Sequence, residues 1–138
     1  MVAGTCVRAL IIDANEHMRR LIATILRATP VTETIEARTP GAAMPLVAGH
    51  DPRLIVMDWS AEATEEILFV HHLRRRELGG HDTPVLALNA VAHHAVLQQA
   101  EDCGIDEMIA KPISAVELIT RATSLIEAAE RRRRKMTE

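Results

Sequence analysis

Four polar residues in this sequence carry side chains that could together handle a phosphoryl group. They are two acids, an amide and an amine, each at or next to the end of a short apolar run: Asp13, Asp58, Asn89 and Lys111. Two neighbouring carboxylates form an oxygen-rich pocket for a hard cation such as Mg²⁺, which usually keeps several of its waters. A carboxylate that such a cation partly neutralises can attack phosphorus. Lys111 could pair with one phosphoryl oxygen, and Asn89 could donate an amide hydrogen to another.

Each of these residues, taken singly, also has an ordinary structural explanation. An acid at a strand end is often only a helix cap or a loop residue, and this explanation competes strongly for Asp13. A lone lysine such as Lys111 is usually a solvated surface residue, and a lone Asn89 usually belongs to a turn. Their joint placement at the ends of separate predicted strands, with Asp58 in the middle, favours a site over coincidence.

Five short runs rich in aliphatic residues are the predicted strands that position these side chains. They are Val7–Ile12, Val31–Ala37, Leu54–Met57, Pro84–Leu88 and Glu107–Ala110. Such runs are typical of parallel strands that are covered on both faces. Five segments with helical spacing alternate with them: one between Asn15 and Pro30, then Pro40–Gly49, a stretch ending at Arg76, Ala92–Asp102, and one that begins at Ser114.

This alternation predicts an α/β fold, a doubly wound five-stranded parallel sheet flanked by five helices. In such a sheet the site lies beyond the carboxyl ends of the strands. We therefore expect the two acids, the amide and the amine to meet at one edge of the sheet.

Composition narrows the classes of function. The formal net charge of −3 argues against a protein that coats nucleic acid with its whole surface, so DNA is not an expected partner. Cys6 and Cys103 lack the spacing of a metal site, and we expect free thiols in a reducing cytoplasm. No apolar run approaches the ~20 residues that a membrane span needs, and no secretory signal precedes the first strand. No nucleophile–base pair is found outside the predicted pocket, which argues against an independent enzyme.

Four segments carry the predicted site residues: LIIDANEHMRR, LIVMDWS, TPVLALNA and MIAKPIS. In their sequence, order and spacing they resemble the receiver domains of two-component response regulators, the CheY-like family. The resemblance implies a flavodoxin-like fold and transfer of a phosphoryl group to Asp58 from a histidine kinase or phosphotransfer protein. It implies Mg²⁺ bound by Asp13, Asp58 and the backbone carbonyl of Ser60, a cis peptide between Lys111 and Pro112, and a downstream partner protein.

The chain also departs from the family pattern in ways that bear on function. Ala14 stands where receivers have a second acid that binds the metal, so weak Mg²⁺ binding is expected. Asn89 replaces a serine or threonine, and Met108 replaces an aromatic residue that swings inward on activation. Glu62 and Glu66 stand where the loop after the acceptor usually has proline and glycine. These departures indicate a divergent receiver, one that is phosphorylated poorly or not at all.

A basic run ends the chain: Arg131, Arg132, Arg133, Arg134 and Lys135. We assign residues 1–130 to the receiver domain and 131–138 to a basic C-terminal extension. One interpretation is a solvated helix end with cations near the negative end of the helix dipole. The run is also similar to that of CheY-like proteins whose arginine-rich tail binds cyclic di-GMP. That resemblance implies an alternative, a phosphorylation-independent adaptor controlled by cyclic di-GMP. Nucleic acid or an anionic membrane surface would suit the same charges.

Overall fold

The computed structural model describes residues 6–75, 82–90 and 94–137, and within these ranges strands and helices alternate as predicted. The strands are β1 (Arg8–Ile12), β2 (Glu33–Ala37), β3 (Leu54–Asp58), β4 (Val85–Asn89) and β5 (Glu107–Ala110). The helices are α1 (Glu16–Leu26), α2 (Pro40–His50), α3 (Thr64–Arg74), α4 (His94–Cys103) and α5 (Ala115–Thr137). The predicted end of the third helix at Arg76 and the predicted start of the fourth at Ala92 lie outside the described residues.

The second strand begins two residues later than predicted, at Glu33 rather than Val31. The backbone N–H of Val31 donates to the hydroxyl of Thr29 (3.2 Å) in the turn that precedes the strand. Parallel pairing with β1 starts only at Glu33, opposite Arg8. The β-branched residues of this segment therefore extended the prediction into a turn.

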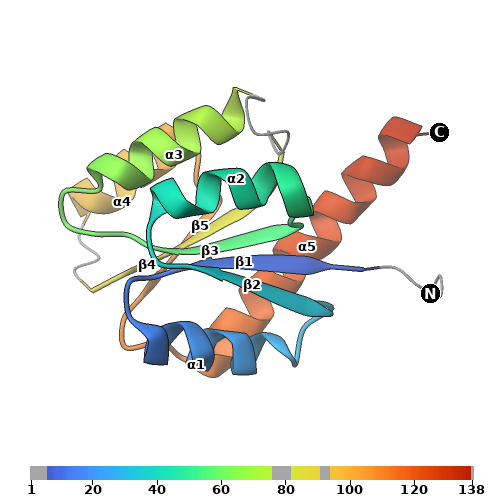
Figure 1. The fold of residues 1–138 in the computed structure, drawn as a ribbon, viewed down its shortest axis with the longest axis horizontal. Helices are drawn as coiled ribbons and strands as arrows, with labels where there is room; N and C mark the ends of the chain where they lie inside the picture. Colours follow the sequence, from blue (N-terminus) through green and yellow to red (C-terminus); the bar gives the residue numbers. More distant parts are fainter. Residues whose placement is uncertain (1–5, 76–81, 91–93, 138) are drawn as a thin grey trace.

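All five strands run parallel in the order β2-β1-β3-β4-β5, so their carboxyl ends lie at one edge of the sheet. Helices α2, α3 and α4 pack on one face, and α1 and α5 pack on the other (Figure 1). This is the doubly wound arrangement that the sequence predicted. None of the helices in the described part of the chain combines the length and the hydropathy of a membrane span.

The core consists of two aliphatic layers, one on each face of the sheet. Successive residues of β3 alternate between them: Ile55 and Met57 pack beneath α2, α3 and α4, while Leu54 and Val56 pack beneath α1 and α5. Because both faces are covered, the strand must be apolar at every position until it reaches the edge. The first polar side chain after this run is Asp58, which is why the acid emerges at the carboxyl edge.

Helix α5 crosses the molecule from one edge of the sheet to the other. It is 23 residues long, about 35 Å at 1.5 Å per residue, and it includes the basic run without a break at residue 130. Its far end is held to the segment that precedes β3. Glu130 pairs with Arg53 at 2.7 Å, and Arg133 lies 3.6 Å from Asp51. The C-terminal turns therefore lie opposite the carboxyl edge (Figure 1).

Candidate functional site

The fold brings the predicted site residues together at the carboxyl edge of the sheet. Two neighbouring cavities share Asp58 and Ser60. One, of about 360 Å³, is also lined by Asp13 from the end of β1. The other, of about 340 Å³, is also lined by Asn89 from the end of β4 and Lys111 from the end of β5. Asp58 therefore occupies the central position that the sequence predicted.

Lys111 forms the closest charge contact in the site. Its Nζ lies 2.6 Å from Oδ1 of Asp58 and 3.8 Å from Oδ2 of Asp13. The backbone supports this placement, since Lys111 N–H donates to the carbonyl of Asn89 at 2.9 Å. The Lys111–Pro112 peptide is cis, as the resemblance implied. The side chain of Asp58 is 35% exposed, so its second oxygen faces a space that a reactant can enter.

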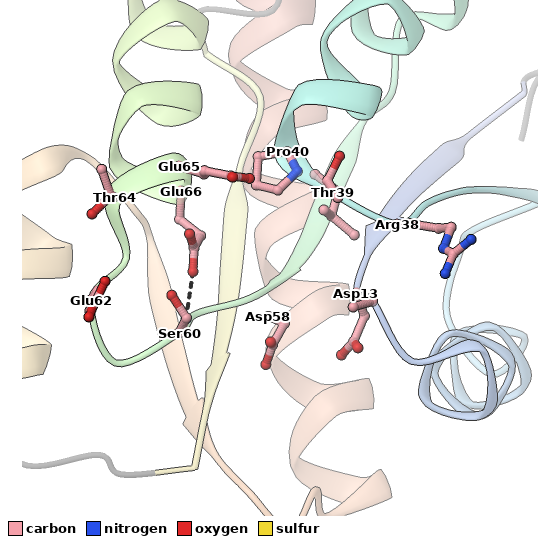
Figure 2. Close-up of a pocket in the computed structure, with 12 residues that line it drawn as sticks. Asp13, Arg38, Thr39, Pro40, Asp58, Ser60, Glu62, Thr64, Glu65 and Glu66 are labelled. Carbon is pink, nitrogen blue, oxygen red and sulfur yellow. Dashed lines mark hydrogen bonds between the residues drawn. The ribbon is translucent and has the colours of Figure 1, made fainter.

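Asp13 is buried and only partly satisfied by hydrogen bonds. Its Oδ1 accepts from the N–H of Asn15 at 2.8 Å, and its carbonyl accepts from Arg19 at 2.8 Å. Its Oδ2 is buried without a hydrogen-bond partner. Figure 2 shows the carboxylates of Asp13 and Asp58 extending in the same direction, while Arg38 projects away from both. Lys111 Nζ, 3.8 Å from Oδ2 of Asp13, offsets its charge without a hydrogen bond, so the position suits a further cation.

The oxygen donors at this edge fit Mg²⁺, though with a small set of ligands. Asp13, Asp58 and the carbonyl of Ser60 are the hard oxygen donors that Mg²⁺ prefers. Ala14 adds none, and across the described residues no group of three or more His, Cys, Asp or Glu side chains is spaced to hold a metal ion. The ligand set therefore resembles a site in which the ion keeps several waters.

Asn89 makes a contact that the sequence did not predict. The residue is buried, and its Nδ2 donates to the carbonyl of Trp59 at 2.6 Å. The amide thus contacts the backbone of the loop that follows the acceptor. The expectation that Asn89 donates to a phosphoryl oxygen stays a prediction. Met108 is half-buried and packs against the core layer beneath α2, α3 and α4.

Glu66 is a site residue that the sequence identified only as a departure from the family pattern. It is 7% exposed, and its Oε2 accepts from the backbone N–H of Ser60 at 2.6 Å (Figure 2). Two signals could have revealed it. It shares helical spacing with the buried residues Phe69, Val70 and Leu73. It is also the third residue of α3, where a carboxylate commonly folds back to an amide before the helix.

The two cysteines lie outside this site and are free thiols, as predicted. Burial raises the pKa of the Cys103 thiol, and the nearby charge of Arg74 partly opposes that shift. Because the thiolate is the reactive form, a raised pKa keeps Cys103 protonated and unreactive at neutral pH. Cys103 therefore packs as a small apolar residue.

The basic run does not join the candidate site. Arg131, Arg132 and Arg134 are exposed, whereas the side chain of Arg133 is 27% exposed and faces Asp51. The run lies at the C-terminal end of α5, opposite the carboxyl ends of the strands (Figure 1). The sequence interpretation assigned the four arginines one shared role, but they differ in exposure and contacts: three are exposed, and Arg133 faces Asp51.

Comparisons with known proteins agree with this geometry. The family model of the response regulator receiver domain matches residues 9–123. The phosphate regulon transcriptional regulatory protein PhoB of Pseudomonas aeruginosa is 31% identical over 117 residues, which is 85% of this chain but 50% of that protein. Chemotaxis protein CheY-3 of Vibrio cholerae is 28% identical over 120 residues, 87% of this chain and 92% of its own length. The chain thus spans about half the length of PhoB and nearly all of CheY-3.

Solved structures show the same fold. The chemotaxis protein CheY4 of Vibrio cholerae superposes with a TM-score of 0.77 at 17% identity, covering 88% of this chain and 99% of that one. The receiver domain of the Francisella response regulator 1452 gives 0.76 at 24% identity, with 88% and 98% covered. At these identities the likeness concerns the fold.

Proposed function

The chain belongs to the response regulator receiver domain family, and on that premise we propose that Asp58 accepts a phosphoryl group from a histidine kinase or a phosphotransfer protein. Receiver domains are signalling switches under phosphorylation control. The observation that carries the assignment of this residue is the contact between Lys111 Nζ and Asp58 Oδ1 at 2.6 Å, in a pocket where Asp58 stays accessible. The contact places a fixed positive charge beside the carboxylate that would react.

The reaction needs little covalent chemistry from the protein. An oxygen of Asp58 forms a bond to phosphorus as the bond between phosphorus and the donor's imidazole nitrogen breaks, and that nitrogen takes a proton from solvent. The product is an acyl phosphate. Lys111 offsets the negative charge on the phosphoryl oxygens, and the surrounding backbone holds Asp58 in position.

Receiver domains typically bind Mg²⁺ at this position. In this chain Asp13, Asp58 and the carbonyl of Ser60 would bind the ion, which when bound neutralises charge on the phosphoryl oxygens. With Ala14 in place of the second acid, we expect the affinity to be low.

The output of the switch is binding to a downstream partner protein rather than catalysis by this domain. Receivers exchange phosphoryl groups with histidine kinases or phosphotransfer proteins, and we place this exchange in the cytoplasm. The charge balance of −3 favours a protein partner over nucleic acid. Exposed apolar side chains near the carboxyl edge, such as Val116 on α5, suit such a contact.

Labelling by a small phosphodonor such as acetyl phosphate tests the acceptor. The full chain should gain one phosphoryl group, and Asp58→Asn, which keeps the shape but not the nucleophile, should gain none. A label that persists on the substituted protein would place the acceptor elsewhere. A full chain that no donor or kinase labels would contradict the proposed function.

A second candidate is a phosphorylation-independent adaptor that binds cyclic di-GMP. It is favoured by the anchoring of α5, where the Glu130–Arg53 and Arg133–Asp51 contacts hold the helix that displays Arg131, Arg132 and Arg134. Arginine pairs with guanine edges and with phosphates. Replacing the three exposed arginines with glutamine should abolish binding measured by calorimetry. Undetectable binding to the full chain would exclude this candidate.

A further inference from the structure

Asn89 and Glu66, two residues that depart from the receiver pattern, form hydrogen bonds to the same peptide group, the one that joins Trp59 to Ser60. Nδ2 of Asn89 donates to its carbonyl, and Oε2 of Glu66 accepts from its N–H, each at 2.6 Å. Because a peptide unit is planar, one bond at the carbonyl and one at the N–H fix the orientation of the whole plane. Asn89 stands where receivers have a serine or threonine, and Glu66 where they have a glycine.

Burial protects these two hydrogen bonds from competition by water. Asn89 is 2% exposed and Glu66 is 7% exposed, so water competes little for either side chain. A buried carboxylate is costly unless hydrogen bonds satisfy it, and the Ser60 N–H supplies one. Removing one partner would leave a polar group unpaired in a dry place, which the surrounding structure resists.

The clamped peptide begins one residue after the acceptor and immediately precedes the Ser60–Ala61 peptide, whose carbonyl is a proposed metal ligand. The carbonyl of Ser60 is the third oxygen of the Mg²⁺ set, and the orientation of the clamped peptide influences where that carbonyl points. Two further bonds brace the same loop. Trp59 N–H donates to the carbonyl of Leu88 at 2.7 Å, and Ala63 N–H donates to the hydroxyl of Ser60 at 3.0 Å.

The two side chains also tie the acceptor loop to separate elements. Asn89 ends β4, and its own carbonyl accepts from the N–H of Lys111. Glu66 lies in the first turn of α3. Through them the loop after Asp58 is held to β4, whose last residue also accepts a hydrogen bond from Lys111, and to α3, which covers the sheet.

We propose that Asn89 and Glu66 are positioning residues that clamp the Trp59–Ser60 peptide and thereby set the Mg²⁺ affinity of the site and the reactivity of Asp58. The proposal rests on Asp58 as the acceptor. By holding the peptide that precedes the Ser60 carbonyl, the clamp limits where this carbonyl can point and partly offsets the ligand that is missing at Ala14. It also gives Asn89 a role on the backbone rather than on the phosphoryl group.

The test compares Glu66→Ala, Glu66→Gln, Asn89→Ala and the Glu66→Ala/Asn89→Ala double variant with the full wild-type chain. Three quantities are measured: hydrogen exchange of the Ser60 amide by NMR without metal or phosphodonor, the Kd for Mg²⁺ from the fluorescence of Trp59, and the rate of labelling by acetyl phosphate. Trp59 is the sole tryptophan, so its emission reports on this loop. Glu65→Ala is the matched control, since Glu65 lines the same cavity but points toward Pro40 (Figure 2).

Loss of either clamp residue should speed exchange of the Ser60 amide, and should raise the Mg²⁺ Kd and slow labelling by on the order of tenfold each. The double variant should resemble the worse single variant, because both residues hold one peptide. Glu66→Gln, which keeps an acceptor oxygen, should retain most of the wild-type behaviour. Glu65→Ala should leave exchange of the Ser60 amide unchanged.

Three results would overturn the clamp. One is unchanged exchange of the Ser60 amide in both Ala variants. Another is a Glu66→Gln variant as defective in Mg²⁺ binding as Glu66→Ala, which would assign the effect to the charge. The third is lower stability to urea with unchanged Mg²⁺ affinity and labelling, which would indicate a structural role alone. A wild-type chain that takes no label would refute the proposed function, while exchange and Mg²⁺ affinity would still decide on the clamp.

Discussion

The buried polar groups around the candidate site and the charged groups at the C-terminal end of α5 are held in different ways. At the carboxyl edge Asp13, Asn89 and Glu66 are buried, and each makes short hydrogen bonds to backbone groups. At the C-terminal end of α5, on the opposite side of the sheet, the contacts are ion pairs between more exposed side chains, such as that of Arg133 with Asp51, whose side chain is 60% exposed. Water and salt weaken pairs of the second kind, while buried groups act through direction and distance.

This difference indicates where a substitution alters function and where it alters little. A buried polar group that loses its partner cannot turn to water, so its neighbours move or the group stays unpaired. An exposed charge that loses its partner is resolvated. Changes at the carboxyl edge should therefore appear in ligand binding and phosphorylation, and changes at the C-terminal end of α5 should appear, if at all, as small shifts in stability.

The chain's two lysines give the largest expected contrast, because one lies at the carboxyl edge and the other at the C-terminal end of α5. Lys111→Gln removes the cation 2.6 Å from Asp58 and should slow labelling by acetyl phosphate by on the order of a hundredfold. Lys135→Gln, on the exposed end of α5, should leave the rate unchanged. Mass spectrometry of the intact protein over time measures both rates. Equal rates for the two variants would remove Lys111 from the site.

The second contrast concerns the metal. Ala14→Asp restores an acid where the family has one, and since Ala14 is exposed the variant should fold normally. A third carboxylate should tighten Mg²⁺ binding by about tenfold, measured from Trp59 fluorescence or by calorimetry. Ala14→Asn, of the same size without the charge, is the control. If the wild type and Ala14→Asp bound Mg²⁺ equally, the absence of the second acid would not limit affinity.

The sequence was sufficient to predict which polar residues meet at the carboxyl edge but not their hydrogen bonds. Asp13 and Asp58 could be placed because each stands where a buried apolar run ends, and such a strand must end where the first charged side chain emerges. Lys111 could be placed because it directly follows the last strand, β5. The partner of Asn89 could not be predicted. It depends on the path of the loop after Asp58, in which Ala63 adopts a positive φ of 52° that no periodicity reveals.

The helical periodicity of the last segment could have predicted which arginine of the basic run faces the domain. Ala122, Ile126 and Ala129 form the buried face of α5, and Arg133 follows Ala129 by four residues. That spacing places Arg133 on the face of α5 that points toward the domain. The other arginines of the basic run lie on the remaining faces of the helix. The structure has this arrangement, with Arg133 against Asp51.

The third prediction concerns the Arg53–Glu130 ion pair, the shorter of the two contacts that hold the end of α5. Arg53 and Glu130 are 24% and 23% exposed and lie 2.7 Å apart, so this pair is more shielded than its neighbours. Glu130→Gln should lower the free energy of unfolding by roughly 1 kcal/mol, since it keeps the shape but removes the charge. Urea unfolding measures this effect, and the Mg²⁺ affinity should stay at the wild-type value. A change in Mg²⁺ affinity would mean that the two regions are coupled through α5.

The smallest expected effect is on stability when the chain is ended at Glu130. The shortened chain loses the whole basic run and the Arg133–Asp51 contact, yet Asp51 retains Arg53 at 3.6 Å. Because these groups are largely exposed, the free energy of unfolding should change by no more than about 0.5 kcal/mol. Labelling of Asp58 should continue at the wild-type rate.

Ligand binding is where removal of the basic run could have a large effect. If the run binds cyclic di-GMP, calorimetry should show binding to the full chain, none to the shortened chain, and little binding of GTP to either. Binding through charge alone would weaken steeply with salt and would not distinguish the two nucleotides. Equal binding of both nucleotides, or of neither, would leave the run as a solvated helix end. In that case the exposed end of α5 would contribute little stability and no recognition of a guanine nucleotide, and the candidate controlled by cyclic di-GMP would be excluded.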